Sequence, residues 1–86
     1  MGRWADLLAA MRASPANVRL RDLRRLVEHL GYVERRRIGS HRIYRHATRP
    51  DLPLINLQEG SAGKAKPYQV RQVLAIVDTY GLEVEP

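Results

Sequence analysis

The strongest constraint on the fold is a predicted β-hairpin in the middle of the chain. The segments YVERRRI (residues 32–38) and HRIYRH (residues 41–46) mix β-branched residues and tyrosine with arginine, and the dipeptide Gly-Ser separates them. Two such segments joined by a short turn are typical of paired antiparallel strands. A third strand is predicted at LINLQ (residues 54–58), after a loop whose two prolines cannot lie inside a strand. The chain is therefore expected to contain a small three-stranded antiparallel sheet.

Three segments around the hairpin show the apolar spacing of amphipathic helices. In residues 3–13 the apolar side chains fall at positions i, i+3, i+4 and i+7, namely Trp4, Leu7, Leu8 and Met11. Residues 20–30 have a similar apolar face, and Gly31 is well placed to end that helix. Pro67 suits the first turn of a last helix, which is expected to run to about Tyr80. The element order predicts an α+β fold, a small α-β-β-β-α domain with helices on one face of the sheet and an extra N-terminal helix.

The size and composition of the chain limit its core and its chemistry. The chain has 86 residues, and a single domain of this size buries only about 60% of the surface that its unfolded chain exposes. It has no Phe and one Trp, so the core must consist mainly of Leu, Val and Ile with a few Tyr. The absence of Cys excludes disulfides and cysteine–zinc sites. No apolar run approaches the ~20 residues that span a membrane, no secretory signal is expected, and we predict a cytoplasmic location.

Positive charge is concentrated in the middle of the chain. The formal net charge is +6, and residues 19–49 contain ten arginines but three acidic residues. A basic block on a small domain favours a polyanionic partner, most often a nucleic acid. The alternative is a solvated surface in an arginine-rich sequence, because 13 of the 15 basic residues are arginine.

Several apparent site motifs fail on their spacing. The stretch GSAGKA (residues 60–65) is not a phosphate-binding P-loop, because its glycines are too close together and alanine replaces the required Ser or Thr. His41 and His46 are five residues apart on one predicted strand, so their side chains point to opposite faces, which argues against a zinc site. Ser40 is adjacent to His41 on the strand, so the two side chains diverge and do not suit a nucleophile pair. His29 lies on the polar side of its helix and is expected to be a surface residue.

Two features keep a chemical interpretation. His41 lies among arginines, and histidine suits proton transfer near neutral pH while arginine can hold phosphate. Lys64 and Lys66 precede the last predicted helix, whose N-terminus also favours anions. By strand alternation His41 shares a face with Ile43 and Arg45. Ile43 is expected to mark the helix-covered face, which places His41 at the rim of that face.

The segments GSHRIYRH (residues 39–46) and GKAKPYQVRQVL (residues 63–74) resemble the HicA family of toxins from bacterial and archaeal type II toxin–antitoxin systems. The resemblance covers roughly residues 18–82 and implies a fold similar to the double-stranded-RNA-binding domain. It also implies an mRNA-cleaving ribonuclease whose catalytic residue is the histidine of the Gly-Ser-His motif, here His41. The implied partner is a HicB-type antitoxin that covers the active site. Arg42 and Gln58 stand near positions at which many members carry histidine.

The sequence therefore predicts a HicA-like endoribonuclease that cleaves mRNA without a metal ion or other cofactor. His41 is expected to be the general acid or base, and the expected phosphate contacts are Arg42, Arg45, Lys64 and Lys66. One histidine cannot occupy both ends of an in-line reaction at once. The second proton transfer is therefore expected from Tyr44, Tyr68 or water.

Two other functions remain compatible with the sequence. One is a module of the same fold that binds RNA or another nucleic acid without cleaving it. The other is a protein-interaction module that docks an acidic partner through the basic residues of the segment 19–49 and the apolar stripe that begins at Trp4 in the N-terminal helix. Residues 1–17 are expected to form a helical extension of a HicA-like domain at residues 18–86. We expect the stripe of this extension to pack on the domain in preference to mediating self-association.

Overall fold

The computed structural model describes residues 2–85, which form three α-helices, a three-stranded sheet and a short 3-10 helix. The elements are α1 (Arg3–Ala13), α2 (Leu20–His29), β1 (Tyr32–Ile38), β2 (His41–His46), β3 (Ile55–Leu57), η1 (Ser61–Gly63) and α3 (Pro67–Tyr80). The predicted α+β class and element order are confirmed. Residue 1, the first of the predicted N-terminal extension (residues 1–17), and residue 86, the last of the predicted domain (residues 18–86), lie outside the described residues.

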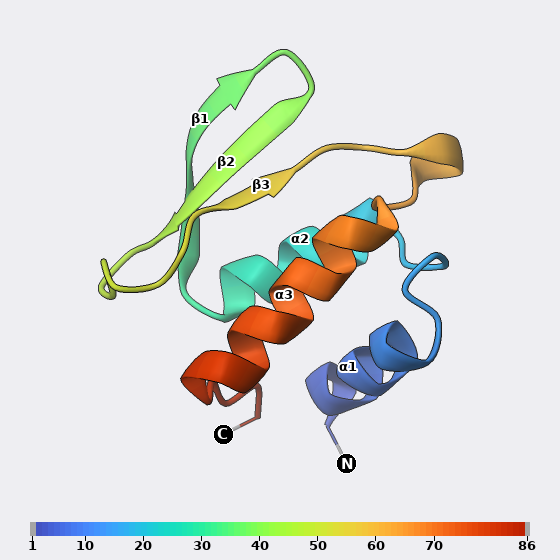
Figure 1. The fold of residues 1–86 in the computed structure, drawn as a ribbon, viewed down its shortest axis with the longest axis horizontal. Coiled ribbons are helices and arrows are strands. Elements are labelled where there is room, and N and C mark those ends of the chain that lie inside the picture. The colour runs from blue at the N-terminus through green and yellow to red at the C-terminus, as the bar shows by residue number, and fades with distance from the viewer. Residues whose placement is uncertain (1, 86) are drawn as a thin grey trace.

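The sheet is antiparallel with strand order β1-β2-β3, and α2 and α3 lie on one of its faces (Figure 1). The hairpin closes tightly, because Ile38 pairs directly with His41 across the turn. Gly39 adopts φ 60° in this turn, a left-handed conformation that glycine takes without a steric penalty. The register shifts between Glu34 and Arg36, which marks a bulge in β1. His41 is therefore fixed at the end of the sheet, beside the turn.

The helix-covered face of the sheet is defined by Tyr44 and not by Ile43. Tyr44 and Ile55 are both 0% exposed and pair with each other across β2 and β3. The Tyr44 hydroxyl accepts a hydrogen bond from Arg24 Nε of α2 at 3.2 Å, so its ring points toward the helices. Ile43 pairs with Asn56 on the opposite, open face. The expected position of Ile43 on the covered face is therefore wrong. The Tyr44 ring fills the space between the sheet and α2, and its hydroxyl is hydrogen bonded there to Arg24.

The N-terminal helix packs on the rest of the chain through its apolar stripe. Two stripe residues are buried in the core and two are half-buried against it: Leu8 and Met11, and Trp4 and Leu7. Helix α1 contacts α3 (Figure 1), and Arg12 donates two hydrogen bonds to the carboxylate of Asp78, at 2.7 and 2.9 Å. This contact lowers the pKa of Asp78. The stripe is thus covered within the chain.

The C-terminal segment closes over the start of α1. The Glu85 carboxylate accepts hydrogen bonds from the main-chain N–H groups of Trp4 (2.8 Å) and Ala5 (3.0 Å), which have no partner inside the helix. Negative charge is also favoured at a helix N-terminus. The His29 ring stacks on Trp4 at a centroid distance of 4.3 Å, and its Nε2 donates to the carbonyl of Val84 at 2.6 Å. His29 is exposed, as expected, but it also joins α1, α2 and the C-terminal segment.

Replacing Glu85 with alanine is expected to lower the stability of the domain. The substitution removes the cap of α1, and losing a helix cap typically destabilises by about 1 kcal/mol. In a domain of this size that corresponds to a melting temperature lower by roughly 4–8 °C. Circular dichroism melting of Glu85→Ala tests this, with Glu83→Ala as a matched control because Glu83 is exposed. Equal melting temperatures for the two variants would show that the contact contributes nothing in solution.

Candidate functional site

His41 lies half-buried at the start of β2 and faces away from the helices. Its Nδ1 is 3.2 Å from Oδ1 of Asn56 in β3. Asn56 and Ile43 form a cross-strand pair on the open face, and His41 lies two residues before Ile43 on the same face. His41 is therefore on the open face, and the expected position at the rim of the covered face is wrong for the same reason as that of Ile43.

A chain of polar side chains runs beside His41. Gln58, which follows β3, donates from Nε2 to the Ser40 hydroxyl at 3.2 Å. The Gln58 Oε1 accepts a hydrogen bond from Lys66 Nζ at 3.0 Å. Because Ser40 directly precedes His41, this chain brings the ammonium group at the start of α3 to the same end of the sheet as the histidine.

Gln69 fixes the position of Gln58 from within the core. It lies in the first turn of α3 and is 2% exposed. Its amide oxygen accepts from the main-chain N–H of Gln58 at 3.0 Å, and its NH₂ group donates to the Gln58 carbonyl at 3.1 Å. Sequence reasoning missed Gln69, although its spacing to Val73 and Ile76 places it on the apolar stripe of α3. A polar residue on such a stripe needs buried hydrogen-bond partners, and that was the available signal.

The two arginines predicted to contact phosphate lie on opposite faces of β2. Arg45 is exposed and shares the open face with His41, roughly 13 Å further along the strand. Arg42 lies on the helix-covered side, where its Nη1 is 3.2 Å from Glu34 Oε1. The Arg42 side chain is 25% exposed and lines a pocket at the hairpin turn, so it reaches the surface beside the site but not on the same face as His41.

The two lysines also point to different places. Lys66 joins the polar chain through Gln58. Lys64 pairs through its main chain with Arg19, just before α2, and lines a pocket of about 400 Å³ together with Arg19 and Arg21. Of the four predicted phosphate contacts, Lys66 is thus the one that hydrogen bonds bring to the end of the sheet occupied by His41.

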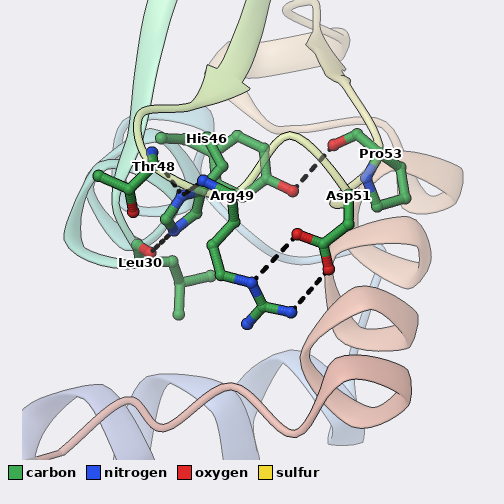
Figure 2. A network of polar contacts seen from close by, with 7 residues as sticks. Leu30, His46, Thr48, Arg49, Asp51 and Pro53 are labelled. Carbon is green, nitrogen blue, oxygen red and sulfur yellow. Dashed lines mark hydrogen bonds and ion pairs between the residues drawn. The ribbon is translucent and has the colours of Figure 1, made fainter.

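His46 holds the main chain together at the other end of β2. Its Nε2 donates to the carbonyl of Leu30 at 2.9 Å, and its Nδ1 accepts from the N–H groups of Thr48 at 3.2 Å and Arg49 at 3.1 Å (Figure 2). Both ring nitrogens are therefore occupied by main-chain groups. The bond to the end of α2 also places this ring on the helix side, opposite His41, as strand alternation predicted.

The two tyrosines considered for the second proton transfer differ in access to solvent. Tyr44 is 0% exposed beneath the sheet, and its hydroxyl contacts Arg24. It therefore cannot reach a substrate bound beside His41. Tyr68 is 52% exposed in the first turn of α3, two residues after Lys66. Of the expected sources of a second proton transfer, Tyr44 is therefore excluded, and Tyr68 and water stay as predictions.

Two further features of residues 2–85 bear on the type of protein. Within this range no three His, Cys, Asp or Glu side chains lie close enough together to hold a metal ion. The helices of this range are all too short or too polar to cross a membrane.

A family model described as the HicA toxin of bacterial toxin–antitoxin systems matches residues 20–78, which is more than half of the chain. The matched range begins at the first residue of α2 and ends within α3. It includes the whole sheet, His41, Asn56 and the polar chain of Ser40, Gln58 and Lys66, whereas α1 lies outside it. No curated protein and no solved structure matches the chain significantly.

Proposed function

The chain belongs to the HicA family of toxins from toxin–antitoxin systems, and we propose that it acts as an mRNA-cleaving endoribonuclease with His41 as its catalytic residue. The observation that carries this proposal is the open-face position of His41, with a lysine ammonium held nearby through Gln58 and Ser40. Imidazole exchanges protons near neutral pH, and cations stabilise the charge that develops on phosphorus oxygens.

In the proposed reaction the 2′-hydroxyl of the RNA is the nucleophile. It loses its proton as the 2′-oxygen forms a bond to the adjacent phosphorus. The bond from phosphorus to the 5′-oxygen breaks, and its electron pair stays on that oxygen, which takes up a proton. The products are a 2′,3′-cyclic phosphate and a 5′-hydroxyl end, and no metal ion is required. His41 serves one of the two proton transfers, and water or Tyr68 serves the other.

Four cationic side chains are proposed to bind the RNA backbone on either side of His41. Lys66 is the contact nearest to the reacting phosphate, and Arg45 extends the contact along the open face. Lys64 lies with Arg19 toward the start of α2, where a further length of the RNA chain would pass. Arg42 contributes only if it exchanges its Glu34 partner for a phosphate.

The proposed protein partner is a HicB-type antitoxin in the cytoplasm. The open face of the sheet carries exposed apolar side chains: Ile38, which is 52% exposed, pairs with His41, and Val33, which is 42% exposed, pairs with Arg45 further along β2. An antitoxin that covered this face would bury these side chains and block access of RNA to His41 in the same contact. Exposed apolar side chains of this kind are typical of the centre of a protein interface, which is more apolar than its rim.

Cleavage of purified RNA in the presence of EDTA tests the proposed activity. Cleavage under these conditions supports a metal-independent endoribonuclease. Binding without cleavage would favour a non-catalytic nucleic-acid-binding module, and neither binding nor cleavage would favour a protein-interaction module. Induced expression in a bacterial host, with growth and total mRNA followed over time, tests the same proposal as a toxin.

Replacing both Lys64 and Lys66 with alanine is expected to weaken binding to any RNA sequence. Each lost contact between a lysine and a phosphate flattens the dependence of log affinity on log salt concentration by roughly 0.7 for a single strand, so the double variant should lose about 1.4 from the slope. Fluorescence anisotropy across a salt series measures this. Arg12→Ala is the control, because Arg12 is paired with Asp78 on the α1–α3 contact. An unchanged slope in the double variant would show that the lysines do not contact phosphate.

A further inference from the structure

We infer that Asn56 is a positioning residue that holds His41 with Nδ1 protonated, so that Nε2 is the nitrogen that takes the proton of the 2′-hydroxyl. The inference rests on the proposed function and specifies the role of His41 within it: general base at Nε2. It follows from the 3.2 Å contact between His41 Nδ1 and Asn56 Oδ1.

The main chain places Asn56 where this contact is nearly unavoidable. Its neighbours in β3, Ile55 and Leu57, are both 0% exposed, so they anchor the strand in the core. Because strand side chains alternate, Asn56 must project onto the open face. Its direct partner on β2 is Ile43, and His41 is the diagonal neighbour, a separation that an imidazole side chain can span.

The donor and acceptor chemistry of the contact selects one tautomer. An amide oxygen only accepts hydrogen bonds, so the ring nitrogen facing it must carry the proton. In neutral imidazole the other nitrogen, Nε2, then holds the free lone pair. When Nε2 takes a proton, Nδ1 keeps its own, and the bond to Asn56 persists. Asn56 thus stabilises the ring before and after proton transfer, as the third group does in catalytic triads in which it orients the base.

Gln58, the other side-chain amide at this end of the sheet, makes its hydrogen bonds to groups other than His41. Gln58 spans from the Ser40 hydroxyl to the Lys66 ammonium, and its main chain is held by Gln69. These bonds hold the end of the hairpin next to His41 but involve neither nitrogen of its ring. Asn56 is the residue whose side chain contacts the ring itself.

Nitrogen-15 NMR of the histidine rings tests the tautomer without depending on cleavage. Native His41, at a pH where the ring is neutral, is expected to show a protonated Nδ1 and an unprotonated Nε2. Asn56→Leu removes the acceptor and should shift the ring toward the Nε2-protonated tautomer that dominates in free histidine. Asn56→Asp retains an acceptor oxygen and should restore the native pattern. Gln72→Ala, which removes an exposed amide on α3, should leave the pattern unchanged.

RNA cleavage by the same variants tests the consequence for the reaction. Asn56→Leu is expected to lower kcat by ~10–100-fold, by analogy with the loss measured when a hydrogen bond that orients a metal-ligating histidine is removed. The KM for RNA should change little, because Asn56 orients the base and does not bind the substrate. Asn56→Asp should recover most of the activity, and Gln72→Ala should retain all of it.

The possible results separate this inference from the proposed function. A native protein that cleaves RNA but shows a protonated Nε2 would overturn the inference alone, as would an Asn56→Leu variant with native kcat and tautomer. A native protein that shows a protonated Nδ1 but does not cleave RNA would contradict the proposed function, and the general-base role with it. The NMR result would in that case still support the contact between Asn56 and His41.

Discussion

His41→Ala is expected to lower RNA cleavage by ~10²–10⁴-fold, the usual effect of losing a general acid or base. The fold should survive, because His41 sits at the end of the hairpin and makes one exposed hydrogen bond, to Asn56. Losing such a bond lowers the free energy of unfolding by about 1 kcal/mol. RNA affinity should also be nearly unchanged, because the backbone contacts are assigned to cationic side chains. Cleavage rate, RNA affinity and melting temperature of the variant and the native protein give the comparison.

His29→Ala is the matched control for the loss of a histidine. His29 stacks on Trp4 and bonds to the carbonyl of Val84, so its removal should lower the melting temperature. It lies at the contact between α2, α1 and the C-terminal segment, away from His41, so cleavage by the folded variant should remain. This pattern is the reverse of that expected for His41→Ala. Equal cleavage by native protein and a well-folded His41→Ala variant would end the proposal that His41 takes part in the reaction.

The boundaries of the elements could be predicted because particular residues mark them. Gly39 closes the hairpin with a positive φ. Pro67 begins α3 at the first helical position, where an N–H group would have no partner inside the helix, so the missing N–H of proline costs no hydrogen bond. Gly81 ends α3 in the left-handed conformation that favours glycine. Each of these effects is local, so the sequence alone was sufficient to place β1, β2 and α3.

The covered face of β2 was not predictable from alternation. Alternation divides the strand into two sets of side chains, one with Ile43 and Arg45 and the other with Tyr44 and Arg42. Each set contains arginine and one large apolar or aromatic side chain, so alternation alone does not say which set is buried. The choice depends on α2, which supplies Arg24 as a donor for the Tyr44 hydroxyl, and on β3, whose Ile55 packs beside Tyr44. Such tertiary contacts cannot be read from the strand itself.

The candidate site was predictable at His41 but not around it. The Gly-Ser-His motif singles out the histidine, whereas the contact with Asn56 depends on the register of β3 against β2. A shift of one residue in that register would turn Asn56 toward the helices, and three residues of strand contain too little pattern to fix it. The pairing of Arg42 with Glu34 likewise depends on the bulge in β1, which no local signal marks.

Tyr44→Ala is expected to destabilise the domain by about 3–5 kcal/mol, the range measured when a buried aromatic side chain is truncated. Tyr44 is 0% exposed and lies at the centre of the sheet, between β1 and β3 and beneath α2. Small domains have a total stability of only ~5–15 kcal/mol, so this single change removes a large part of it. Denaturant unfolding followed by circular dichroism measures the loss, and the variant should lose cleavage in proportion to its unfolded fraction.

Tyr44→Phe separates packing from chemistry at the same position. The ring still fills the core, but Arg24 loses its hydroxyl partner, so the free energy of unfolding should fall by about 1 kcal/mol. Cleavage by the folded protein should stay within a few-fold of native, because a hydroxyl on the helix side of the sheet cannot deliver a proton to RNA on the open face. Tyr68→Phe is the companion variant at the other candidate tyrosine. The exposed Tyr68 should tolerate the change without loss of stability, and lower cleavage by this variant would identify Tyr68 as the second proton donor. Loss of cleavage in Tyr44→Phe at an unchanged melting temperature would instead mean that the substrate reaches the helix side, and that the open face does not carry the reaction.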